Sequence, residues 1–361
     1  MVPIFNSFLP LFDGHLDLAW NALSFNRDLT LPLDQLREID ASYPDAPYRG
    51  SCLITLEELA KANLKVCVAT LLARSGPHAP PAMLRRELDY AHPSIAHGHA
   101  YGQFSYYLWL QKSNHVRIIK SRRHLDDHWE NPNNLGLILS FEGCDPVLDL
   151  DDLYLWFELG VRVAGLTHYG VGQYAGGTNT RSGLTPDGFA LLREFQELGM
   201  ILDITHLSDE SIEDVFNVYD GPIIASHHNC REIVPGQRQL SNDHIKELIH
   251  RDAVIGTALD AWMLYPGWKR NQTDRSVINF DDVIDHMEHI CSIAGSSKFV
   301  GIGSDLDGGF GVDQTPTGLD RYAHLHLMAD VLSLRGFAPG DIHNIFYQNW
   351  LNFFQKSLPV L

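Results

Sequence analysis

The stretch Leu11-Phe12-Asp13-Gly14-His15-Leu16-Asp17 places a histidine and an aspartate directly after a short apolar run. The same arrangement returns near the other end of the chain, where Phe299-Val300-Gly301-Ile302-Gly303 runs into Ser304-Asp305-Leu306-Asp307. Between these two stretches, further apolar runs end in residues suited to metal binding or acid-base chemistry. Because parallel barrels assemble their active sites from the carboxyl ends of their strands, this repeated placement indicates an enzyme.

Eight apolar runs are candidate strands, and most are continuous rather than alternating, as expected of strands covered on both faces of a parallel sheet. They cover residues 10–12, 66–72, 136–141, 161–166, 200–204, 222–225, 253–259 and 299–303. The segments between them have helical spacing. One helix is expected from Thr185 to Leu198, with a proline near its start and Gly199 after its end, and others begin near Ser208, Ser241 and Asp281.

This alternation predicts an α/β fold, a (β/α)8 TIM barrel formed as one domain by residues 1–361. Two insertions follow the first two strands, at 27–51 and 74–129, and the second is expected to contain a long helix packed on the barrel. A doubly wound sheet is the alternative fold. That fold would need a glycine-rich phosphate turn after its first strand, where this chain has Gly14 alone.

The composition favours a small-molecule substrate. The chain has 27 Lys and Arg against 45 Asp and Glu, and its net charge of -18 disfavours nucleic acid and anionic membrane surfaces as partners. No uninterrupted apolar run of about 18 residues occurs, and the first residues lack a basic signal region, so we expect a cytoplasmic chain. The five cysteines form no C-x-x-C pair and are expected to be reduced and mostly buried.

The pair His15 and Asp17 is the first candidate for metal binding. Residues two apart on a strand point to the same face, so both side chains would face one site, although a solvated turn is the alternative. The H-x-D pattern alone is weak evidence, because it recurs at 124–126 in a polar stretch and at 250–252 at a helix end.

Three further ligand candidates end other strands. Glu142 follows a very apolar run, where an unpaired carboxylate would be costly to bury, and His206 and His227 end two successive strands. Each alone has an ordinary explanation, a salt-bridged or helix-capping glutamate or a hydrogen-bonded core histidine. Together with His15 and Asp17 they make five ligands, which suggests two metals about 3.5 to 4 Å apart, with Glu142 shared between them.

Other residues after strands are candidates for handling the substrate. Asp305 is a candidate acid-base group, with Asp307 ranked second, and either is otherwise an ordinary loop aspartate. His168 is a candidate donor to a developing oxyanion, and Arg238 to a substrate carboxylate unless it is simply solvated. His228 should face away from the site. The ends of the second and seventh strands carry no residue to which we assign a role.

These motifs, in their order along the chain, resemble those of the membrane (renal) dipeptidase family, a zinc-peptidase branch of the amidohydrolase superfamily. The motifs are Asp13-Gly14-His15-Leu16-Asp17, Phe141-Glu142-Gly143, Leu166-Thr167-His168, Asp203-Ile204-Thr205-His206-Leu207-Ser208, Ala225-Ser226-His227-His228-Asn229, Arg238-Gln239-Leu240 and Gly303-Ser304-Asp305-Leu306-Asp307-Gly308. The chain departs from the family pattern at Leu16 and Gln239, where asparagine is usual.

The resemblance implies a barrel with two Zn²⁺ ions that cleaves dipeptides, including those with a D-configured C-terminal residue, through a hydroxide bridging the metals. It assigns His15 and Asp17 to one zinc, His206 and His227 to the other, and Glu142 to both. It also implies that His168 holds the substrate carbonyl, Arg238 its C-terminal carboxylate, and Asp305 the transferred proton.

The resemblance further implies a homodimer, and no membrane partner is expected. Two other functions remain open: an amidohydrolase acting on another amide, an ester or a lactone, and a catalytically inactive metal-binding paralogue.

Overall fold

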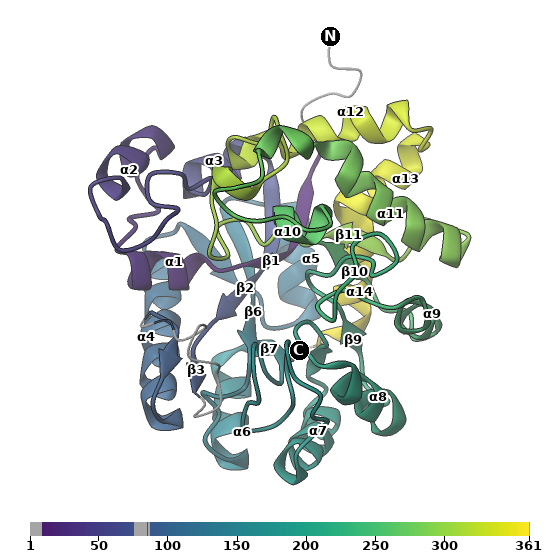
Figure 1. Cartoon of the computed structure of the whole chain (residues 1–361). Helices are drawn as coiled ribbons and strands as arrows, with labels where there is room; N and C mark the ends of the chain where they lie inside the picture. Colours follow the sequence, from purple (N-terminus) through teal and green to yellow (C-terminus); the bar gives the residue numbers. More distant parts are fainter. Residues whose placement is uncertain (1–8, 76–84, 86, 361) are drawn as a thin grey trace.

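The computed structural model describes residues 9–75, 85 and 87–360, which form a parallel barrel surrounded by helices (Figure 1). The barrel strands are β1 (Leu11–Leu16), β2 (Leu64–Leu71), β6 (Leu135–Glu142), β7 (Val161–Gly165), β8 (Ile201–Asp203), β9 (Ile223–Ile224), β10 (Ile255–Thr257) and β11 (Val300–Ile302). They pair in the order β10-β11-β1-β2-β6-β7-β8-β9, and a parallel bridge between Ala225 and Ile255 joins the two ends. The predicted (β/α)8 barrel is confirmed.

The helices lie around the sheet. They are α1 (Leu18–Phe25), α2 (Leu33–Asp40), α3 (Leu56–Lys61), α4 (Pro93–Lys112), α5 (Arg122–Glu130), α6 (Leu150–Leu159), α7 (Pro186–Leu198), α8 (Asp209–Val218), α9 (Asn242–His250), α10 (Ala261–Leu264), α11 (Phe280–Ala294), α12 (Leu327–Leu334), α13 (Pro339–His343) and α14 (Asn349–Ser357). Short helical turns are η2 (Arg275–Val277), η3 (Val312–Gln314), η4 (Tyr322–His326) and η5 (Asn344–Gln348). The expected caps Thr185, Ser208 and Ser241 each accept a backbone N–H of their helix.

The two predicted insertions are present after β1 and β2. The first contains α2, whose Asp40 forms buried ion pairs with Arg27 (2.9 Å) and Arg49 (2.5 Å). The second contains the expected long helix α4, but also β3 (Arg74–Ser75), β4 (Asp89–Tyr90), β5 (Val116–Ile118) and α5. Strand β5 pairs with the start of β6, which the sequence analysis did not predict. Residues 76–84 and 86 of this insertion, like 1–8 and 361, lie outside the described residues.

The first strand is longer than the predicted 10–12, because its buried polar residue Asp13 has hydrogen-bond partners outside the strand. The Asp13 carboxylate accepts hydrogen bonds from the Ser304 backbone N–H (2.9 Å) and the Tyr322 hydroxyl (2.7 Å). A buried polar group with such partners does not interrupt a strand. The seventh barrel strand is shorter than the predicted 253–259, since only Ile255–Thr257 pair with β11.

One end of the barrel is filled by apolar side chains. Phe12, Val66 and Ile138 point inward and pack with Trp350 of α14. Added Cβ atoms on Gly14 and Gly301 would lie 2.5 Å and 2.3 Å from Trp350 ring atoms, so glycine at these positions makes room for the indole. The indole N–H donates to the Ile302 carbonyl (2.9 Å). Packing at this end leaves the opposite end, at the carboxyl ends of the strands, for a site.

A β-bulge in β1 decides which side chains of that strand face the interior. Leu11 and Leu16 both pack in the outer core, although residues five apart would face opposite sides of a regular strand. The pairing of β1 with β2 shifts register between Asp13 and Leu16. A bulge of this kind redirects the following side chains, and here it turns His15 and Asp17 toward the barrel interior.

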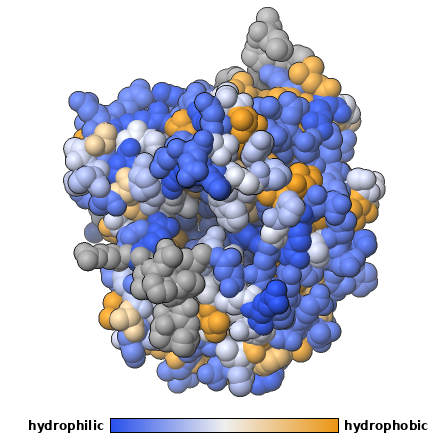
Figure 2. Space-filling view, in the orientation of Figure 1, coloured by the Kyte–Doolittle hydropathy of each residue, from blue (hydrophilic) through white to orange (hydrophobic). Residues whose placement is uncertain are grey.

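The five cysteines are unpaired, with four buried and Cys291 half-buried, as predicted. On the face shown in Figure 2, hydrophilic residues predominate and hydrophobic ones occur in small groups. Among the described residues, the helices are too short or too polar to traverse a bilayer.

Candidate metal centre

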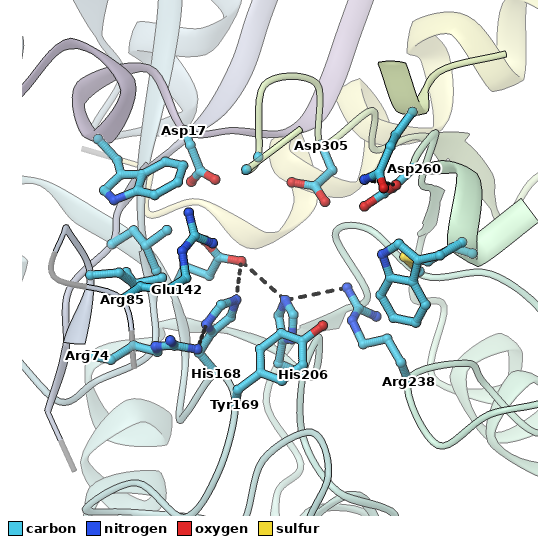
Figure 3. Close-up of a pocket in the computed structure, with 18 of the residues that line it drawn as sticks. Asp17, Arg74, Arg85, Glu142, His168, Tyr169, His206, Arg238, Asp260 and Asp305 are labelled. Carbon is cyan, nitrogen blue, oxygen red and sulfur yellow. Dashed lines mark hydrogen bonds and ion pairs between the residues drawn. The ribbon is translucent and has the colours of Figure 1, made fainter. Parts of the chain in front are cut away.

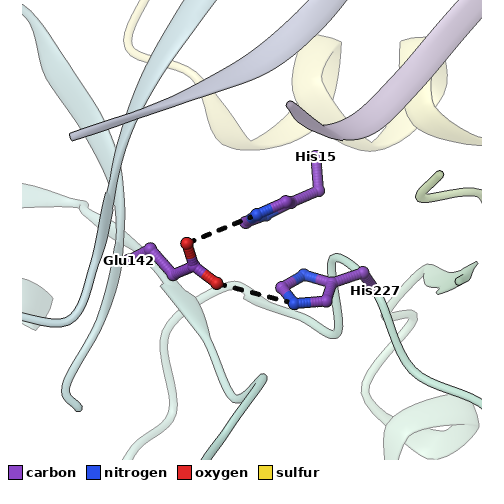
Figure 4. A group of neighbouring side chains, drawn as sticks. All are labelled: His15, Glu142 and His227. Carbon is purple, nitrogen blue, oxygen red and sulfur yellow. Dashed lines mark ion pairs between the residues drawn. The ribbon is translucent and has the colours of Figure 1, made fainter. Parts of the chain in front are cut away.

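All five predicted ligands meet at the carboxyl ends of the strands. His15 lies in β1, Asp17 follows it, Glu142 is the last residue of β6, and His206 and His227 follow β8 and β9. The Glu142 carboxylate is at the centre of the group. Its Oε2 lies 3.6 Å from His15 Nε2, and its Oε1 lies 3.6 Å from His227 Nε2 (Figure 4). The same Oε1 lies 3.3 Å from His206 Nε2.

Two polar atoms at this centre are buried without a hydrogen-bond partner among the described residues, His15 Nε2 and Glu142 Oε2. Burial, and next the negative charge of Asp17, raise the pKa of Glu142 to about 7. A carboxylate so placed is costly to bury unless a cation compensates it. Imidazole nitrogens and carboxylate oxygens are the ligands that Zn²⁺ takes, so these residues fit a metal site.

Three overlapping groups of side chains could each hold one ion, with ligand atoms within 4.8 Å of one another in each group. They are His15 with Glu142 and His227, Glu142 with His168 and His206, and His15 with Asp17 and Asp305. Glu142 and His15 each belong to two of these groups, so the groups share ligand candidates. The grouping differs from the expected one, since His227 is grouped with His15, although His206 Nε2 lies 3.2 Å from His227 Nε2.

The imidazole rings are held by hydroxyl groups on their Nδ1 side. The Ser226 hydroxyl lies 2.9 Å from His227 Nδ1 and 3.3 Å from His15 Nδ1, and the Thr178 hydroxyl lies 3.1 Å from His206 Nδ1. These contacts direct the Nε2 atoms toward Glu142, as outer hydrogen bonds orient histidine ligands in metal sites.

Burial and nearby positive groups affect the three histidines unequally. Burial, with the positive charge of Arg238, holds the pKa of His206 well below its usual range, and burial does the same for His227. Both rings are therefore neutral, which is the form that binds metals. Burial, the largest effect, disfavours the charged form of His15, but Glu142 and Asp17 together outweigh it and raise the pKa of His15 well above its usual value.

The backbone is left-handed at His206, Asp305 and Asp307, with φ of 69°, 55° and 61°. Such conformations are uncommon for residues other than glycine and gather at functional sites. At His206 the conformation is supported by the Thr178 hydroxyl, which donates to the His206 carbonyl (3.1 Å).

Asp305 and Asp307 have different surroundings despite their similar positions in the sequence. Asp305 lines the cavity, and its Oδ1 lies 4.0 Å from His15 Nε2. Burial raises the pKa of Asp305 well above its usual range. The Asp307 carboxylate instead accepts the backbone N–H groups of Leu53 (2.9 Å) and Ile54 (3.0 Å). The Asp307 carboxylate therefore holds the backbone that follows the first insertion, which agrees with its rank below Asp305 as an acid-base candidate.

Next to the centre lies a cavity of about 330 Å³ (Figure 3). Its lining includes Asp17, Glu142, His168, His206, Arg238 and Asp305 of the predicted residues. His168 Nε2 lies 3.5 Å from Glu142 Oε1. Across the cavity, Figure 3 shows a chain of contacts from Arg74 through His168, Glu142 and His206 to Arg238. Among the described residues, the candidate metal groups do not include His228.

Arg238 is buried at the cavity wall. Its Nη2 donates to the His227 carbonyl (2.9 Å), while its Nε and Nη1 have no hydrogen-bond partner among the described residues. The loop that carries it is fixed by Gln239, whose side-chain amide donates to the Met263 carbonyl (2.8 Å). The glutamine at this position is therefore compatible with an ordered loop. Two unpaired guanidinium donors beside a cavity are suited in charge and geometry to an anion such as a carboxylate.

Eight polar or aromatic residues of the cavity wall were not predicted from the sequence: Trp20, Arg74, Arg85, Tyr169, Asp260, Trp262, Arg270 and Gln314. Arg74 follows the end of β2 and Asp260 follows the end of β10, the two strand ends to which no role was assigned. Their positions directly after strands could have identified these two residues as candidates for the site.

A model of the membrane dipeptidase family, peptidase family M19, matches residues 5–358. The dipeptidase aclJ of Aspergillus oryzae is 29% identical over 219 residues, which cover 59% of this chain and 50% of that protein. The chain spans about half the length of the curated relatives it matches first, 54%, 50% and 48%.

Two solved structures have the same fold. One is a metallopeptidase from Rhodobacter sphaeroides bound to a phosphinate mimic of the dipeptide L-Ala-D-Ala, with a TM-score of 0.78, 20% identity, and coverage of 97% of this chain and 99% of that chain. The other is the probable dipeptidase PvdM from Pseudomonas aeruginosa, with a TM-score of 0.75, 17% identity, and coverage of 97% and 96%.

Proposed function

The chain belongs to the membrane dipeptidase family, peptidase family M19, and on that premise we propose that it is a di-zinc dipeptidase. The observation that carries the proposal is the buried Glu142 carboxylate, which has an imidazole Nε2 beside one oxygen and two more beside the other. This arrangement suits a carboxylate shared by two cations. We assign His15 and Asp17 to one zinc, His206 and His227 to the other, and Glu142 to both.

When bound, the two ions supply a water nucleophile at neutral pH and positive charge for the scissile carbonyl oxygen. The chain's own residues bind the substrate around them. Arg238 binds the C-terminal carboxylate of the dipeptide through its unpaired Nε and Nη1 donors. Holding the carboxylate there places the peptide bond toward Glu142, because Arg238 Nη2 lies only 3.5 Å from His206 Nε2.

Two other residues act on the reacting groups. His168 donates a hydrogen bond to the carbonyl oxygen as negative charge develops on it. Asp305, whose carboxyl lines the cavity, accepts the proton of the attacking water and passes it to the departing amine. The 4.0 Å from Asp305 to His15 places this carboxyl beside the metal ligands.

The substrate is proposed to be a free dipeptide, including one whose C-terminal residue has the D configuration. The cavity of about 330 Å³ suits a ligand of this size, and a structural relative binds a mimic of L-Ala-D-Ala. A homodimer and a cytoplasmic location are further parts of the proposal, and they rest on the sequence analysis.

The test is a panel of L,L and L,D dipeptides assayed on protein of measured zinc content. We expect hydrolysis of free dipeptides by protein with two zinc ions per chain, and loss of hydrolysis on chelation. Hydrolysis of esters or lactones with no turnover of any dipeptide would contradict the proposal, as would the absence of turnover in fully loaded protein. Light scattering during size-exclusion chromatography tests the dimer.

A further inference from the structure

The contact between Arg74 and His168 fixes where the proton of His168 lies. Arg74 Nη1 is 2.9 Å from His168 Nδ1. A guanidinium has only N–H donors and stays protonated, so His168 Nδ1 must accept the hydrogen bond. An imidazole that accepts at Nδ1 is neutral and carries its hydrogen on Nε2.

The Nε2–H group of His168 faces the metal centre, 3.5 Å from Glu142 Oε1. A nitrogen that carries hydrogen has no lone pair for a metal. The geometric group of Glu142, His168 and His206 therefore contains one imidazole that is a donor and not a ligand, although its position alone would suit an ion.

His206 shows the opposite arrangement in the same cluster. The Thr178 hydroxyl donates its one hydrogen to the His206 carbonyl (3.1 Å), so toward His206 Nδ1 (3.1 Å) its oxygen acts as the acceptor. Hydrogen on Nδ1 leaves the Nε2 lone pair of His206 free to bind a metal. The two neighbouring imidazoles therefore have opposite tautomers. The Thr178 hydroxyl oxygen leaves the His206 Nε2 free to bind a metal, whereas the Arg74 guanidinium makes the His168 Nε2 a hydrogen-bond donor.

We propose that Arg74 is a positioning residue that makes His168 a hydrogen-bond donor to the substrate and prevents it from binding a metal. Its effect on the substrate rests on the proposed dipeptidase function. The positive charge behind the ring also strengthens Nε2–H as a donor to a developing oxyanion, since chains of hydrogen bonds polarise one another.

Arg74 is itself held in place. Its Nε and Nη2 lie 2.7 Å and 2.6 Å from Asp89 Oδ1, and Arg74 and Asp89 are paired residues of β3 and β4. With these two nitrogens bound to Asp89, the remaining Nη1 faces His168. A buried guanidinium fixed by a carboxylate is rigid enough to impose one tautomer on its neighbour.

The direct test is the tautomer of His168 in zinc-loaded protein. Protein labelled with ¹⁵N-histidine is examined by long-range ¹H–¹⁵N NMR, and the His168 signals are identified by their loss in His168→Ala. We expect a protonated Nε2 and an unprotonated Nδ1. Hydrogen on Nδ1, or the spectrum of an Nε2 bound to zinc, would overturn the proposal. This measurement uses the wild-type chain, so it needs no substitution of Arg74.

A double-mutant cycle tests whether Arg74 acts through His168. We expect Arg74→Met to lower kcat about 10- to 100-fold while zinc content stays at the wild-type value. In the His168→Ala background the same change should alter kcat less than about threefold. Equal losses in both backgrounds would mean that Arg74 has only a structural role.

Arg74→Lys is the conservative variant, because a lysine also donates and never accepts. It should keep the His168 tautomer and most of kcat, even if Arg74→Met folds poorly. Loss of the tautomer in Arg74→Lys would contradict the proposal. If the wild-type enzyme hydrolyses no dipeptide, the proposed function is wrong, whereas the tautomer measured by NMR still supports or overturns the role of Arg74.

Discussion

Replacing Arg238 by alanine should selectively impair substrates that carry a free C-terminal carboxylate. The guanidinium is buried at the cavity wall, with Nη2 bound to the His227 carbonyl and both Nε and Nη1 unpaired among the described residues. Truncating one partner of a buried charge pair costs about 2 to 5 kcal/mol. At 1.4 kcal/mol for each factor of ten, kcat/KM on a free dipeptide should fall roughly 30- to several-thousand-fold.

The assay compares a free dipeptide with the same dipeptide carrying a C-terminal amide. For wild-type enzyme, kcat/KM on the amide should be lower than on the free dipeptide by about the factor that Arg238→Ala loses on the free dipeptide. On the amide, wild-type enzyme and Arg238→Ala should have nearly equal kcat/KM. Zinc content should be unchanged. The variant Arg238→Lys keeps the positive charge but loses the two-donor guanidinium. Its kcat/KM on the free dipeptide should lie between those of wild type and Arg238→Ala.

An unchanged kcat/KM of Arg238→Ala on the free dipeptide would refute the recognition of a carboxylate. That result would favour the alternative function, hydrolysis of another amide, an ester or a lactone. Equal losses on the free dipeptide and on the amide would instead mean that the substitution disturbs the centre as a whole.

Three further predictions follow from the fold and the site. His206→Ala should remove one metal and nearly all activity, as measured by metal analysis and dipeptide turnover, and full activity with two metals bound would contradict the assignment. Trp350→Ala should lower the free energy of unfolding in urea by about 3 to 5 kcal/mol, whereas Leu334→Ala at an exposed position (66%) should change it by less than about 0.5 kcal/mol. Burial raises the pKa of Asp260 from 3.8 to about 7, so the folded state binds more protons than the unfolded state in this window and loses stability as pH rises through it. Asp260→Asn removes this pH dependence. The free energy of unfolding of the variant, relative to wild type, should therefore increase by on the order of 2 kcal/mol from pH 5 to 7 and then level off. A difference that stays constant with pH would contradict the raised pKa.

The meeting of the candidate ligands was predictable because barrel topology brings residues at the ends of different strands together in space. Glu142, His206 and His227 follow strands that are far apart in the sequence, yet their side chains meet within 3.6 Å. The pair His15 and Asp17 was predicted from alternation alone. Both side chains still face the site, although the pairing of β1 with β2 shifts register between Asp13 and Leu16 and this irregularity leaves no clear signal in the sequence.

The rest of the site depended on contacts that the sequence does not reveal. Asp305 and Asp307 both follow β11, and only the three-dimensional path of the chain after the first insertion shows that Asp307 binds the backbone of Leu53. Arg74 resembles a solvated arginine after a strand until its contact with His168 is known. The extra strand β5, Val116–Ile118, is too short for its pattern to differ from that of a loop.

The central claim is that two metal ions share the Glu142 carboxylate. Its most direct test is an anomalous difference map, recorded above and below the zinc absorption edge, from crystals of zinc-loaded protein. The account predicts two peaks per chain, one beside each Glu142 oxygen, with His15 on one side and His206 on the other. A single peak, or peaks that leave Glu142 without a metal, would contradict it.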